Sequence, residues 1–419
     1  MIERMELLPG IDLQIFSDDR FKQNCMSIQL VRSADAGEAA YNALLPAVLL
    51  RGCTGAPDLR AITARLDDLY GASIGALVRR VGDYQTTGLS CSFISDRFTL
   101  EGDKILAPML DFLRQLLLEP VLENGIFRAD YVEGEKKNLI ATIQAQKNDK
   151  RAYCAAQMLR KMCARDSYGI PRLGEAEAVA QITPESLYAH YQKILAQSKI
   201  LILYVGQADE ALPEMLKAVF REIPRSYVNL PAQTHFSSAG GGEYTEQLDI
   251  AQGKLCMGFS SDIDLRCGDI AAMQVCNVVF GGGMTSKLFM NVREKMSLCY
   301  DIGSSFHGSK GILTVSAGID CDKEDLVRRQ IMTQLKAVCD GDITDDELLA
   351  AKQALISGLR GTHDSPSGIE GYYSSGALSG LGWTPAEYIA AVEKVDREAV
   401  AAAARGLQLD TVYFLKGVQ

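Results

Sequence analysis

Two side chains that donate hydrogen bonds, the guanidinium group of Arg293 and the phenol of Tyr300, stand close together between positions 280 and 300. Such groups are able to bind a ligand when both face one cleft. Three consecutive glycines, Gly281, Gly282 and Gly283, come shortly before them and give the backbone conformational freedom. This stretch is therefore the first candidate for a functional site.

The elements that position these two side chains are expected to be a loop followed by a short amphipathic helix. Thr285 or Ser286 offers the N-cap oxygen. The apolar members of the helix are Leu288, Phe289 and Val292. Arg293 and Tyr300 then lie about two turns apart and are able to face one cleft. An ordinary loop and helix, with Arg293 in solvent and Tyr300 opening a strand, fits the same spacing.

Other catalytic patterns are absent from the sequence. It contains four histidines, His190, His235, His307 and His363, and no two of them lie within a helical turn of each other. Neither G-x-S-x-G nor H-E-x-x-H occurs, and the glycine run does not continue into a P-loop lysine. We interpret the isolated histidines as surface or structural residues.

The composition limits the kinds of partner and the cellular compartment that we expect. The formal net charge is -10 and the pI about 5.1, which argues against nucleic acid or an anionic membrane as a partner. The eleven cysteines include no C-x-x-C pair, and most lie in apolar runs. Such cysteines are typical of a reducing compartment. With no signal-peptide pattern and no apolar run long enough to span a bilayer, we expect a cytoplasmic protein.

The order of elements indicates two similar halves, each mixing paired strands with helices. The apolar strand Lys199–Val205, preceded by a helix that Thr183 and Pro184 open, is echoed by Thr411–Leu415 after the helix 396–404. Residues 224–242 combine Pro, Ser and consecutive Gly without periodicity. We therefore expect an α+β fold of two homologous domains, each an antiparallel-rich mixed sheet covered by helices. The expected division is 1–223, a linker at 224–242, and 243–419.

Several local features give sharper expectations. Pro46 predicts that the helical run 37–50 is kinked or begins near the proline. The runs Ile11–Phe16 and Met26–Val31 predict two strands joined by a polar turn. Thr344 and Glu347 predict a capping box at the start of a long helix. Residues 361–384, rich in Gly and Ser, predict an irregular connection.

The run from Gly281 to Tyr300, together with Ile343–Lys352, resembles the pitrilysin/insulinase family of zinc peptidases, and the resemblance covers nearly the whole chain. It implies two homologous α+β domains per chain, with two such chains, or two halves of a longer one, enclosing an unfolded peptide. In that family the arginine and tyrosine of this motif hydrogen-bond the substrate backbone near the scissile carbonyl. One departure is Ser297, where the family usually has glycine.

The metal site that the resemblance implies is an H-x-x-E-H helix plus a distal glutamate, which bind zinc and activate water. Here the corresponding positions are Ala43, Pro46 and Ala47, with Thr142 where the distal glutamate is expected. None of these four residues has the side chain that the family uses there. The resemblance therefore implies a chain that lacks zinc hydrolysis of its own.

A chain with the Arg/Tyr motif and without the metal ligands resembles the non-catalytic half of a heterodimeric peptidase. The resemblance implies that Arg293 and Tyr300, with Gly281 to Gly283, bind an unfolded peptide at the zinc site of an H-x-x-E-H partner. The alternative is a structural or peptide-binding homologue that has no peptidase activity. Such a chain would pair with itself as a homodimer, and one possible role is in the maturation of another protein.

Overall fold

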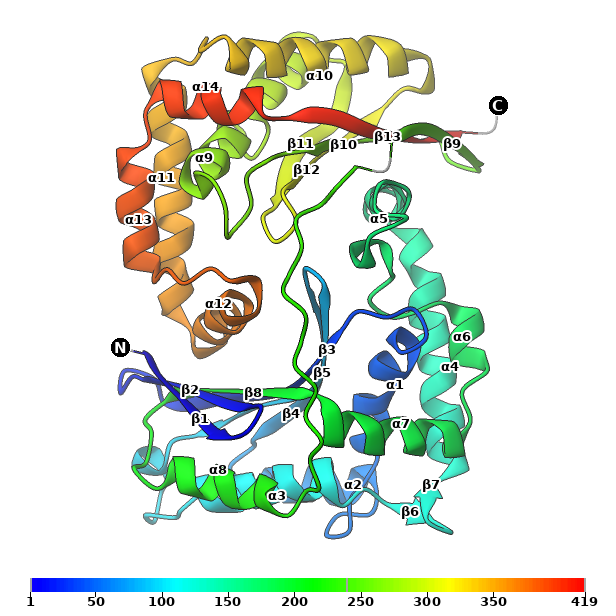
Figure 1. The fold of residues 1–419 in the computed structure, drawn as a ribbon, viewed down its shortest axis with the longest axis vertical. Coiled ribbons are helices and arrows are strands. Elements are labelled where there is room, and N and C mark those ends of the chain that lie inside the picture. Colours follow the sequence, from blue (N-terminus) through cyan, green and yellow to red (C-terminus); the bar gives the residue numbers. More distant parts are fainter. Residues whose placement is uncertain (1, 239, 418–419) are drawn as a thin grey trace. The chain divides into compact units, whose positions relative to one another are not determined.

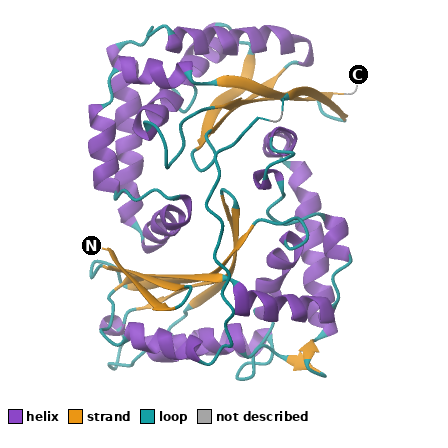
Figure 2. Cartoon of the chain, viewed as in Figure 1, coloured by secondary structure: helices purple, strands orange, loops and turns teal. Residues whose placement is uncertain are grey.

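The computed structural model describes residues 2–238 and 240–417 (Figures 1 and 2). Met1, Ala239, Val418 and Gln419 lie outside the described residues, and Ala239 falls in the expected linker. The chain forms two compact units. The first contains Met1–Gln144, Pro171–Ala232 and His363–Leu378, and the second contains Ala145–Ile170, Gln233–Thr362 and Ser379–Gln419.

The first unit is built on a six-stranded mixed sheet. The strand order is β1-β2-β8-β3-β5-β4. Their bounds are β1 (Ile2–Leu8), β2 (Ile11–Ser17), β3 (Gln23–Ser33), β4 (Ser73–Val81), β5 (Tyr84–Ile94) and β8 (Lys199–Gly206). Only β2 and β8 pair in parallel, and all other neighbours are antiparallel. A separate two-stranded ribbon consists of β6 (Leu122–Glu123) and β7 (Ile126–Phe127).

One face of this sheet carries most of the helices of the first half. They are α1 (Ala39–Leu49), α2 (Leu59–Asp68), α3 (Leu106–Leu118), α4 (Ala129–Ala145), α6 (Ala176–Ala180), α7 (Pro184–Gln197) and α8 (Leu212–Arg221). Of these, α1, α3, α7 and α8 contact the strands directly and bury a common apolar core with them. The expected cap of α7 is present, because the Thr183 side chain accepts a hydrogen bond from the backbone of Ser186.

Strand β8 is buried on both faces, and this explains its uninterrupted apolar sequence. Ile200, Ile202 and Tyr204 belong to the core beneath the helices just named. The alternate residues Leu203 and Val205 pack against α12 (Pro366–Ser379), a helix from the second half of the sequence. The expectation of a buried central strand is confirmed.

The second unit is built on a five-stranded sheet of order β11-β12-β10-β13-β9. Their bounds are β9 (Gly242–Leu248), β10 (Gly253–Ser260), β11 (Cys299–His307), β12 (Ile312–Ile319) and β13 (Gln408–Gly417). Its helices are α5 (Lys150–Met162), α9 (Ile270–Phe280), α10 (Glu324–Cys339), α11 (Asp345–Gly361), α13 (Pro385–Lys394) and α14 (Arg397–Arg405). The capping box expected at Thr344 and Glu347 opens α11.

Helix α5 covers the second face of this sheet, although it belongs to the first half of the sequence. Cys154, Met158 and Met162 repeat every fourth residue and pack against Cys256 on β10. The Sδ atoms of both methionines would lie 2.6 Å from a Cβ atom at position 258, so any residue larger than glycine would require them to shift. Each half of the chain thus lends one helix to the sheet of the other unit.

The two sheets repeat one topology. In both, one parallel pair (β2 with β8, β9 with β13) is followed by three antiparallel pairs in the same order of strands. Strand β1 is an addition at the edge of the first sheet. The expected α+β fold of two homologous mixed sheets covered by helices is confirmed. By this correspondence α9 is the counterpart of α1, and β11 is the counterpart of β4.

One local expectation is wrong. Residues 361–384 are not simply a Gly/Ser-rich connection, because α12 forms there and buries Ile369 and Tyr373 against the first sheet. The two strands expected at 11–16 and 26–31 are confirmed as β2 and β3, and β8 lies between them in the sheet. Of the two alternatives for the helical run 37–50, a start near Pro46 is excluded, because α1 begins at Ala39 and contains Pro46. Proline removes the helical bond to the Asn42 carbonyl, and that oxygen accepts a hydrogen bond from Thr87 Oγ1 at 2.7 Å instead.

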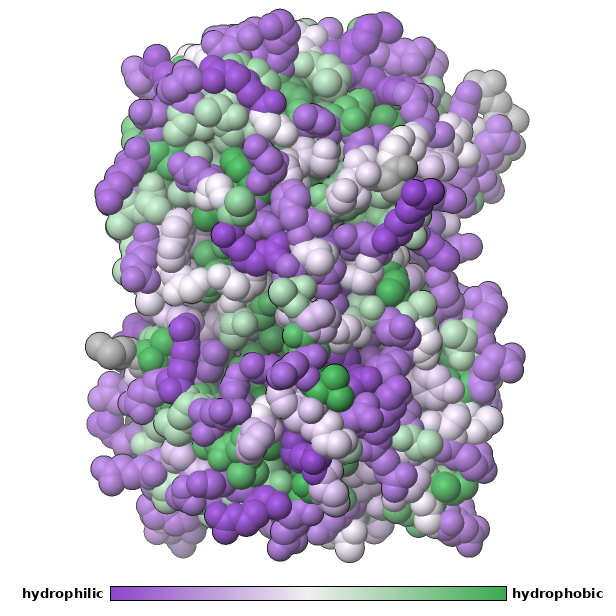
Figure 3. All heavy atoms as spheres, viewed as in Figure 1, coloured by the Kyte–Doolittle hydropathy of each residue, from purple (hydrophilic) through white to green (hydrophobic). Residues whose placement is uncertain are grey.

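The described part of the chain contains no helix that is both long and apolar enough to cross a membrane. The face shown in Figure 3 is largely hydrophilic, with smaller hydrophobic areas between the polar ones. All eleven cysteines lie among the described residues, and all are free.

Candidate functional site

The stretch from Gly281 to Tyr300 forms a loop, a π-helix and the start of an edge strand in the second unit. After α9, a tight loop leads into the π-helix η4 (Leu288–Lys295), and β11 follows. Leu288 and Val292 are fully buried, as expected for the apolar side of the helix. The N-cap expected from Thr285 or Ser286 is absent, because no side chain caps the first turn of η4. Ser286 Oγ accepts only a long hydrogen bond of 3.4 Å from the Phe289 N–H.

Gly281 and Gly282 serve close packing, and none of the three glycines serves a left-handed backbone conformation. None of Gly281, Gly282 and Gly283 has a positive φ. A Cβ atom at Gly281 would lie 2.7 Å from Ser304 Oγ, and one at Gly282 would lie 2.9 Å from the Val278 Cα. The Gly281 carbonyl accepts a hydrogen bond from the Ser304 N–H at 2.9 Å, which ties the loop to β11. The loop is therefore held against its strand.

Two polar contacts fix the π-helix to the helices around it. Lys287, whose side chain is 6% exposed, forms an ion pair with Glu347 at 3.0 Å. Glu347 is also the capping-box residue of α11, so the two segments that carry the family resemblance meet here. Asn291 Nδ2 donates to Gln334 Oε1 on α10 at 2.6 Å. Neither contact was predicted, because nothing in the sequence relates these positions.

Arg293 is partly exposed and held by its neighbours on the π-helix. Its guanidinium carbon lies 4.6 Å from the centre of the Phe289 ring, in a cation–π contact. It also forms a long ion pair of 3.5 Å with Glu294, which is itself half exposed. A pair of this kind contributes little to stability. The guanidinium group is thus positioned by an aromatic face and remains able to bind a further acceptor.

Tyr300 lies at a β-bulge on the edge strand β11. Cys299 pairs with Ile319 and Asp301 pairs with Gly318, so Tyr300 is the extra residue between them. Bulges commonly redirect a side chain, and the Tyr300 ring is 54% exposed. Its hydroxyl donates to Asp320 Oδ1 at 2.9 Å. This hydrogen bond to a carboxylate raises the pKa of the phenol, so it remains a donor at neutral pH.

The backbone before Tyr300 turns through a left-handed residue, Ser297, at φ 51°. This is the position at which the resemblance leads one to expect glycine. The left-handed region costs a side chain such as serine about 1 kcal/mol, whereas glycine adopts it readily. The departure from the family pattern therefore changes the energy of the turn but not its shape.

We expect the substitution Ser297→Gly to leave the fold intact and to raise the free energy of unfolding by up to about 1 kcal/mol. Urea denaturation measures this change. Ser297→Val is the contrasting variant, because a β-branched residue is strongly disfavoured at positive φ, and it should lower stability. A loss of stability in the glycine variant would contradict the backbone conformation described here.

The positions corresponding to the family's metal ligands lie on α1 and α4 of the first unit. Ala43 and Pro46 are buried, and Ala47 is partly exposed. None of the three has a donor atom on its side chain. Thr142 is exposed, and its hydroxyl donates to the Asn138 carbonyl at 2.9 Å. These residues do not fit a zinc ion, and no group of three His, Cys, Asp or Glu side chains in the described ranges is arranged to hold a metal.

A buried polar network lies beside α1. His190 Nε2 lies 2.8 Å from Asn42 Oδ1, and Asn42 Nδ2 donates to Gln85 Oε1 at 3.0 Å. Since Asn42 Oδ1 is an acceptor, His190 donates through Nε2. Burial lowers the pKa of His190 to about 4, so the ring is neutral at physiological pH. His190 is a structural residue in this arrangement.

This network makes stability depend on pH. In the unfolded chain His190 regains an ordinary pKa of 6.5, so between about pH 6.5 and pH 4 the unfolded state binds the additional proton. Stability therefore falls as the pH is lowered through this window, by about 3 kcal/mol in total from this residue. Denaturation curves at several pH values measure the loss. In His190→Gln the slope between pH 6.5 and 5 should be smaller than in the unchanged chain.

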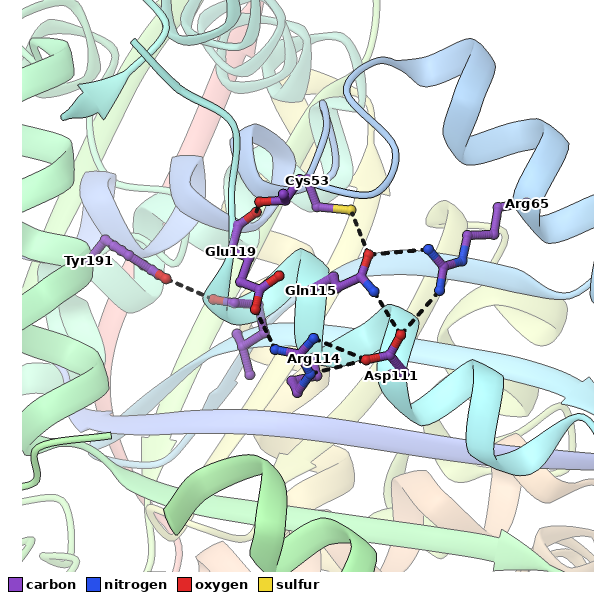
Figure 4. Close-up of polar contacts among 9 residues, drawn as sticks. Cys53, Arg65, Asp111, Arg114, Gln115, Glu119 and Tyr191 are labelled. Carbon is purple, nitrogen blue, oxygen red and sulfur yellow. Dashed lines mark hydrogen bonds and ion pairs between the residues drawn. The ribbon is translucent and has the colours of Figure 1, made fainter. Parts of the chain in front are cut away.

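A second polar cluster surrounds the loop after α1, and Figure 4 shows it. Asp111 accepts hydrogen bonds from Arg65, Arg114 and Gln115, and Arg114 also forms an ion pair with Glu119. Cys53 Sγ donates to Gln115 Oε1 at 3.9 Å. Burial raises the pKa of the Cys53 thiol, so it is not a reactive thiolate. The cluster fastens α2 to α3 and offers no nucleophile.

Comparisons with known proteins agree with this geometry. Residues 181–355 match the family model described as the peptidase M16 inactive domain. The chain is 29% identical over 411 residues to the probable inactive metalloprotease YmfF of Bacillus subtilis, covering 98% of this chain and 96% of that protein.

Two solved structures share the fold over the whole chain. A conserved protein from Enterococcus faecalis V583 superposes with a TM-score of 0.93 at 28% identity, covering 100% of this chain and 99% of that one. A peptidase M16 inactive domain from Pseudomonas fluorescens superposes with a TM-score of 0.83 at 19% identity, covering 100% and 98%. The resemblance to the pitrilysin/insulinase peptidases is confirmed: the chain is similar in sequence to proteins described as inactive M16 peptidases and shares their fold over its whole length.

Proposed function

We propose that the chain is the non-catalytic subunit of a heterodimeric zinc peptidase, and that Arg293 and Tyr300 bind the peptide at the zinc site of an H-x-x-E-H partner. One observation carries the proposal: the Gly281–Tyr300 motif is held in a defined geometry, whereas the metal-site positions have no ligands. The zinc belongs to the partner subunit in this proposal. Gly281, Gly282 and Gly283 belong to the proposed binding motif, and of the three Gly281 allows the loop to lie against β11.

The chemistry of the two side chains supports this role. A guanidinium group donates up to five hydrogen bonds without losing its charge, and a phenol donates one. Together they are able to orient a peptide carbonyl and to stabilise the negative charge that develops on its oxygen during attack by water. Both side chains are partly exposed, so a peptide is able to reach them.

Reconstitution tests the proposal. The chain, isolated from its own cells with a tag, should co-purify with a homologous H-x-x-E-H protein of similar length. Zinc-dependent cleavage of an unfolded peptide should appear in the mixture and be absent from each protein alone. A chelator should abolish the activity, and added zinc should restore it. Equal activity of the partner with and without this chain would overturn the proposal.

A second candidate is a peptide-binding or structural homologue without any peptidase partner, acting as a homodimer, for example in the maturation of another protein. The exposed methionines around the motif favour it, because Met284, Met290 and Met296 offer flexible apolar contacts for an unfolded segment. In this case a labelled unfolded peptide binds to the chain alone and is not cleaved under any zinc condition. We also propose a cytoplasmic location, since all eleven cysteines are free.

A further inference from the structure

A cavity of about 540 Å³ lies in the first unit, between the end of α3 and helix α7. Its walls are mainly aromatic and apolar, with side chains from Leu118, Leu122, Tyr188, Tyr191, Leu195 and Ile223. Cavities of this size and lining are typical of sites for small molecules. Neither Arg293 and Tyr300 nor the positions of the family's metal ligands line it.

The aromatic wall of the cavity is held in one arrangement. The ring centres of Tyr188 and Tyr191 lie 5.8 Å apart, with the rings tilted by 36°. Phe127 on β7 packs edge-on against both rings, with its centre 5.5 Å from each. The Tyr191 hydroxyl also donates to the Leu117 carbonyl at 3.0 Å. This wall is therefore formed without a ligand, so a ligand does not have to order it.

A further wall consists of residues 223 and 224, which follow α8. Hydrogen bonds of the next two residues hold this segment on the end of α7. Arg225 Nη1 donates to the Leu195 carbonyl at 2.8 Å, and the Ser226 N–H donates to the Ala196 carbonyl at 2.9 Å. These bonds also satisfy backbone carbonyls at the end of a helix, which otherwise lack partners.

The charge in the lining is negative. Glu119 carries the only formal charge among the lining residues, all of which the structure describes. Its Oε1 accepts a hydrogen bond from Arg114, which lies outside the lining (Figure 4). The Glu119 side chain is 40% exposed, and its carboxylate is able to accept further hydrogen bonds. Helix α3 ends just before it, at Leu118, and adds the partial negative charge of a helix C-terminus.

This combination selects the chemistry of the ligand. An anion would meet the carboxylate and the helix end without a cation in the lining to offset them. A purely apolar ligand would take water from the carboxylate and give it no hydrogen bond in return. An ammonium group donates hydrogen bonds to the carboxylate, and the faces of tyrosine rings attract a cation. Because Glu119 already pairs with Arg114, this attraction comes from the carboxylate and the rings together and not from an unpaired charge.

We propose that this cavity binds a small organic amine. Its protonated amino group contacts Glu119, and its ring or branched apolar part packs on the aromatic wall and on Leu195. The cavity lies in the first unit, whereas Arg293 and Tyr300 lie in the second, so the site is independent of the function proposed above.

Calorimetric titration of the full chain at pH 7 and low salt tests the proposal with three ligands that share one ring. We expect 2-phenylethylamine, which is protonated at this pH, to bind saturably with a Kd of about 1 mM or tighter. The uncharged 2-phenylethanol should bind at least about tenfold more weakly, because it makes no charged hydrogen bond. The anion phenylacetate should not bind measurably.

Three variants locate the site. Glu119→Gln keeps the shape of the side chain and should weaken amine binding by at least about tenfold, with little effect on 2-phenylethanol. Ala196→Phe places a ring in the cavity, leaves the Ala196 carbonyl bonded to Ser226, and should abolish binding of both ligands. Glu214→Gln is the matched control, because it removes an exposed carboxylate on α8 that does not line the cavity. Thermal melting confirms that each variant is folded.

Absence of saturable amine binding would overturn the proposal. Equal affinity of Glu119→Gln and Glu214→Gln for the amine would do so as well, since it would show that the amine binds elsewhere on this negatively charged chain. Equal binding of the amine and 2-phenylethanol would overturn the assignment of a cation as the ligand.

Discussion

Replacing Arg293 by alanine is expected to lower kcat/KM for peptide hydrolysis by the reconstituted pair by about 10²–10³. The guanidinium group is held over Phe289 and partly exposed, so the variant loses a positioned charge and disturbs little of the core. The loss should appear in kcat more than in KM, because the charge on the substrate oxygen develops in the transition state. Steady-state kinetics with one fluorogenic peptide measure both parameters.

Tyr300→Phe and a distant arginine provide the matched comparisons. The phenol donates a single neutral hydrogen bond, so its removal should cost about tenfold in kcat/KM. Arg329→Ala removes an exposed arginine on α10 of the same unit and should leave the kinetics unchanged. Unchanged activity in both Arg293→Ala and Tyr300→Phe would rule out a supporting role in catalysis and favour the peptide-binding alternative.

The substitution Asp166→Ala is expected to destabilise the second unit by about 3–5 kcal/mol. Lys310, in the turn between β11 and β12, is fully buried, and its Nζ lies 2.9 Å from Asp166 Oδ2. Removing the carboxylate takes away a counter-charge that this buried ammonium group has in the folded chain. Because Asp166 follows α5 in the sequence, the variant should also loosen α5 on its sheet. Urea denaturation measures the stability, and hydrogen exchange locates the loosened segment.

The double variant Asp166→Ala with Lys310→Met tests the cause. Methionine fills a similar volume without charge, and replacing a buried ion pair by apolar groups is often nearly neutral. The double variant should therefore be more stable than Asp166→Ala alone. If the two variants are equally unstable, the loss arises from the hydrogen bond that Asp166 accepts from the Tyr168 N–H and not from the buried charge.

Local sequence signals predicted many of the elements because their causes are local. Thr183 and Thr344 cap the helices that they were expected to open. The strands β2 and β3 were predicted from their apolar runs and the polar turn between them. By contrast, β1 and β9 were not recognised. Strand β1 is mostly exposed or half-buried, and β9 alternates between exposed and half-buried residues and pairs in parallel with β13, a strand far away in the sequence.

In the candidate site, too, the features with local causes were predicted and those that depend on distant residues were not. The types of Arg293 and Tyr300 and their association with three glycines were visible in the sequence. The bulge that leaves the Tyr300 ring exposed depends on the register between β11 and β12, which no local signal encodes. The ion pair between Lys287 and Glu347 joins residues sixty positions apart. Helix α12 could not be predicted either, because the sequence indicated a Gly/Ser-rich connection at that point.

By itself, the sequence determined the α+β class, the duplication of the sheet and the lack of zinc ligands at Ala43, Pro46 and Ala47. These properties depend on residue type and on patterns that repeat along the chain. Only the tertiary structure decided that α5 covers the second sheet and that α12 covers the first. The physical reason is that β8, β10 and β13 are apolar on both faces, and each sheet buries its second face with a helix from the other half of the chain.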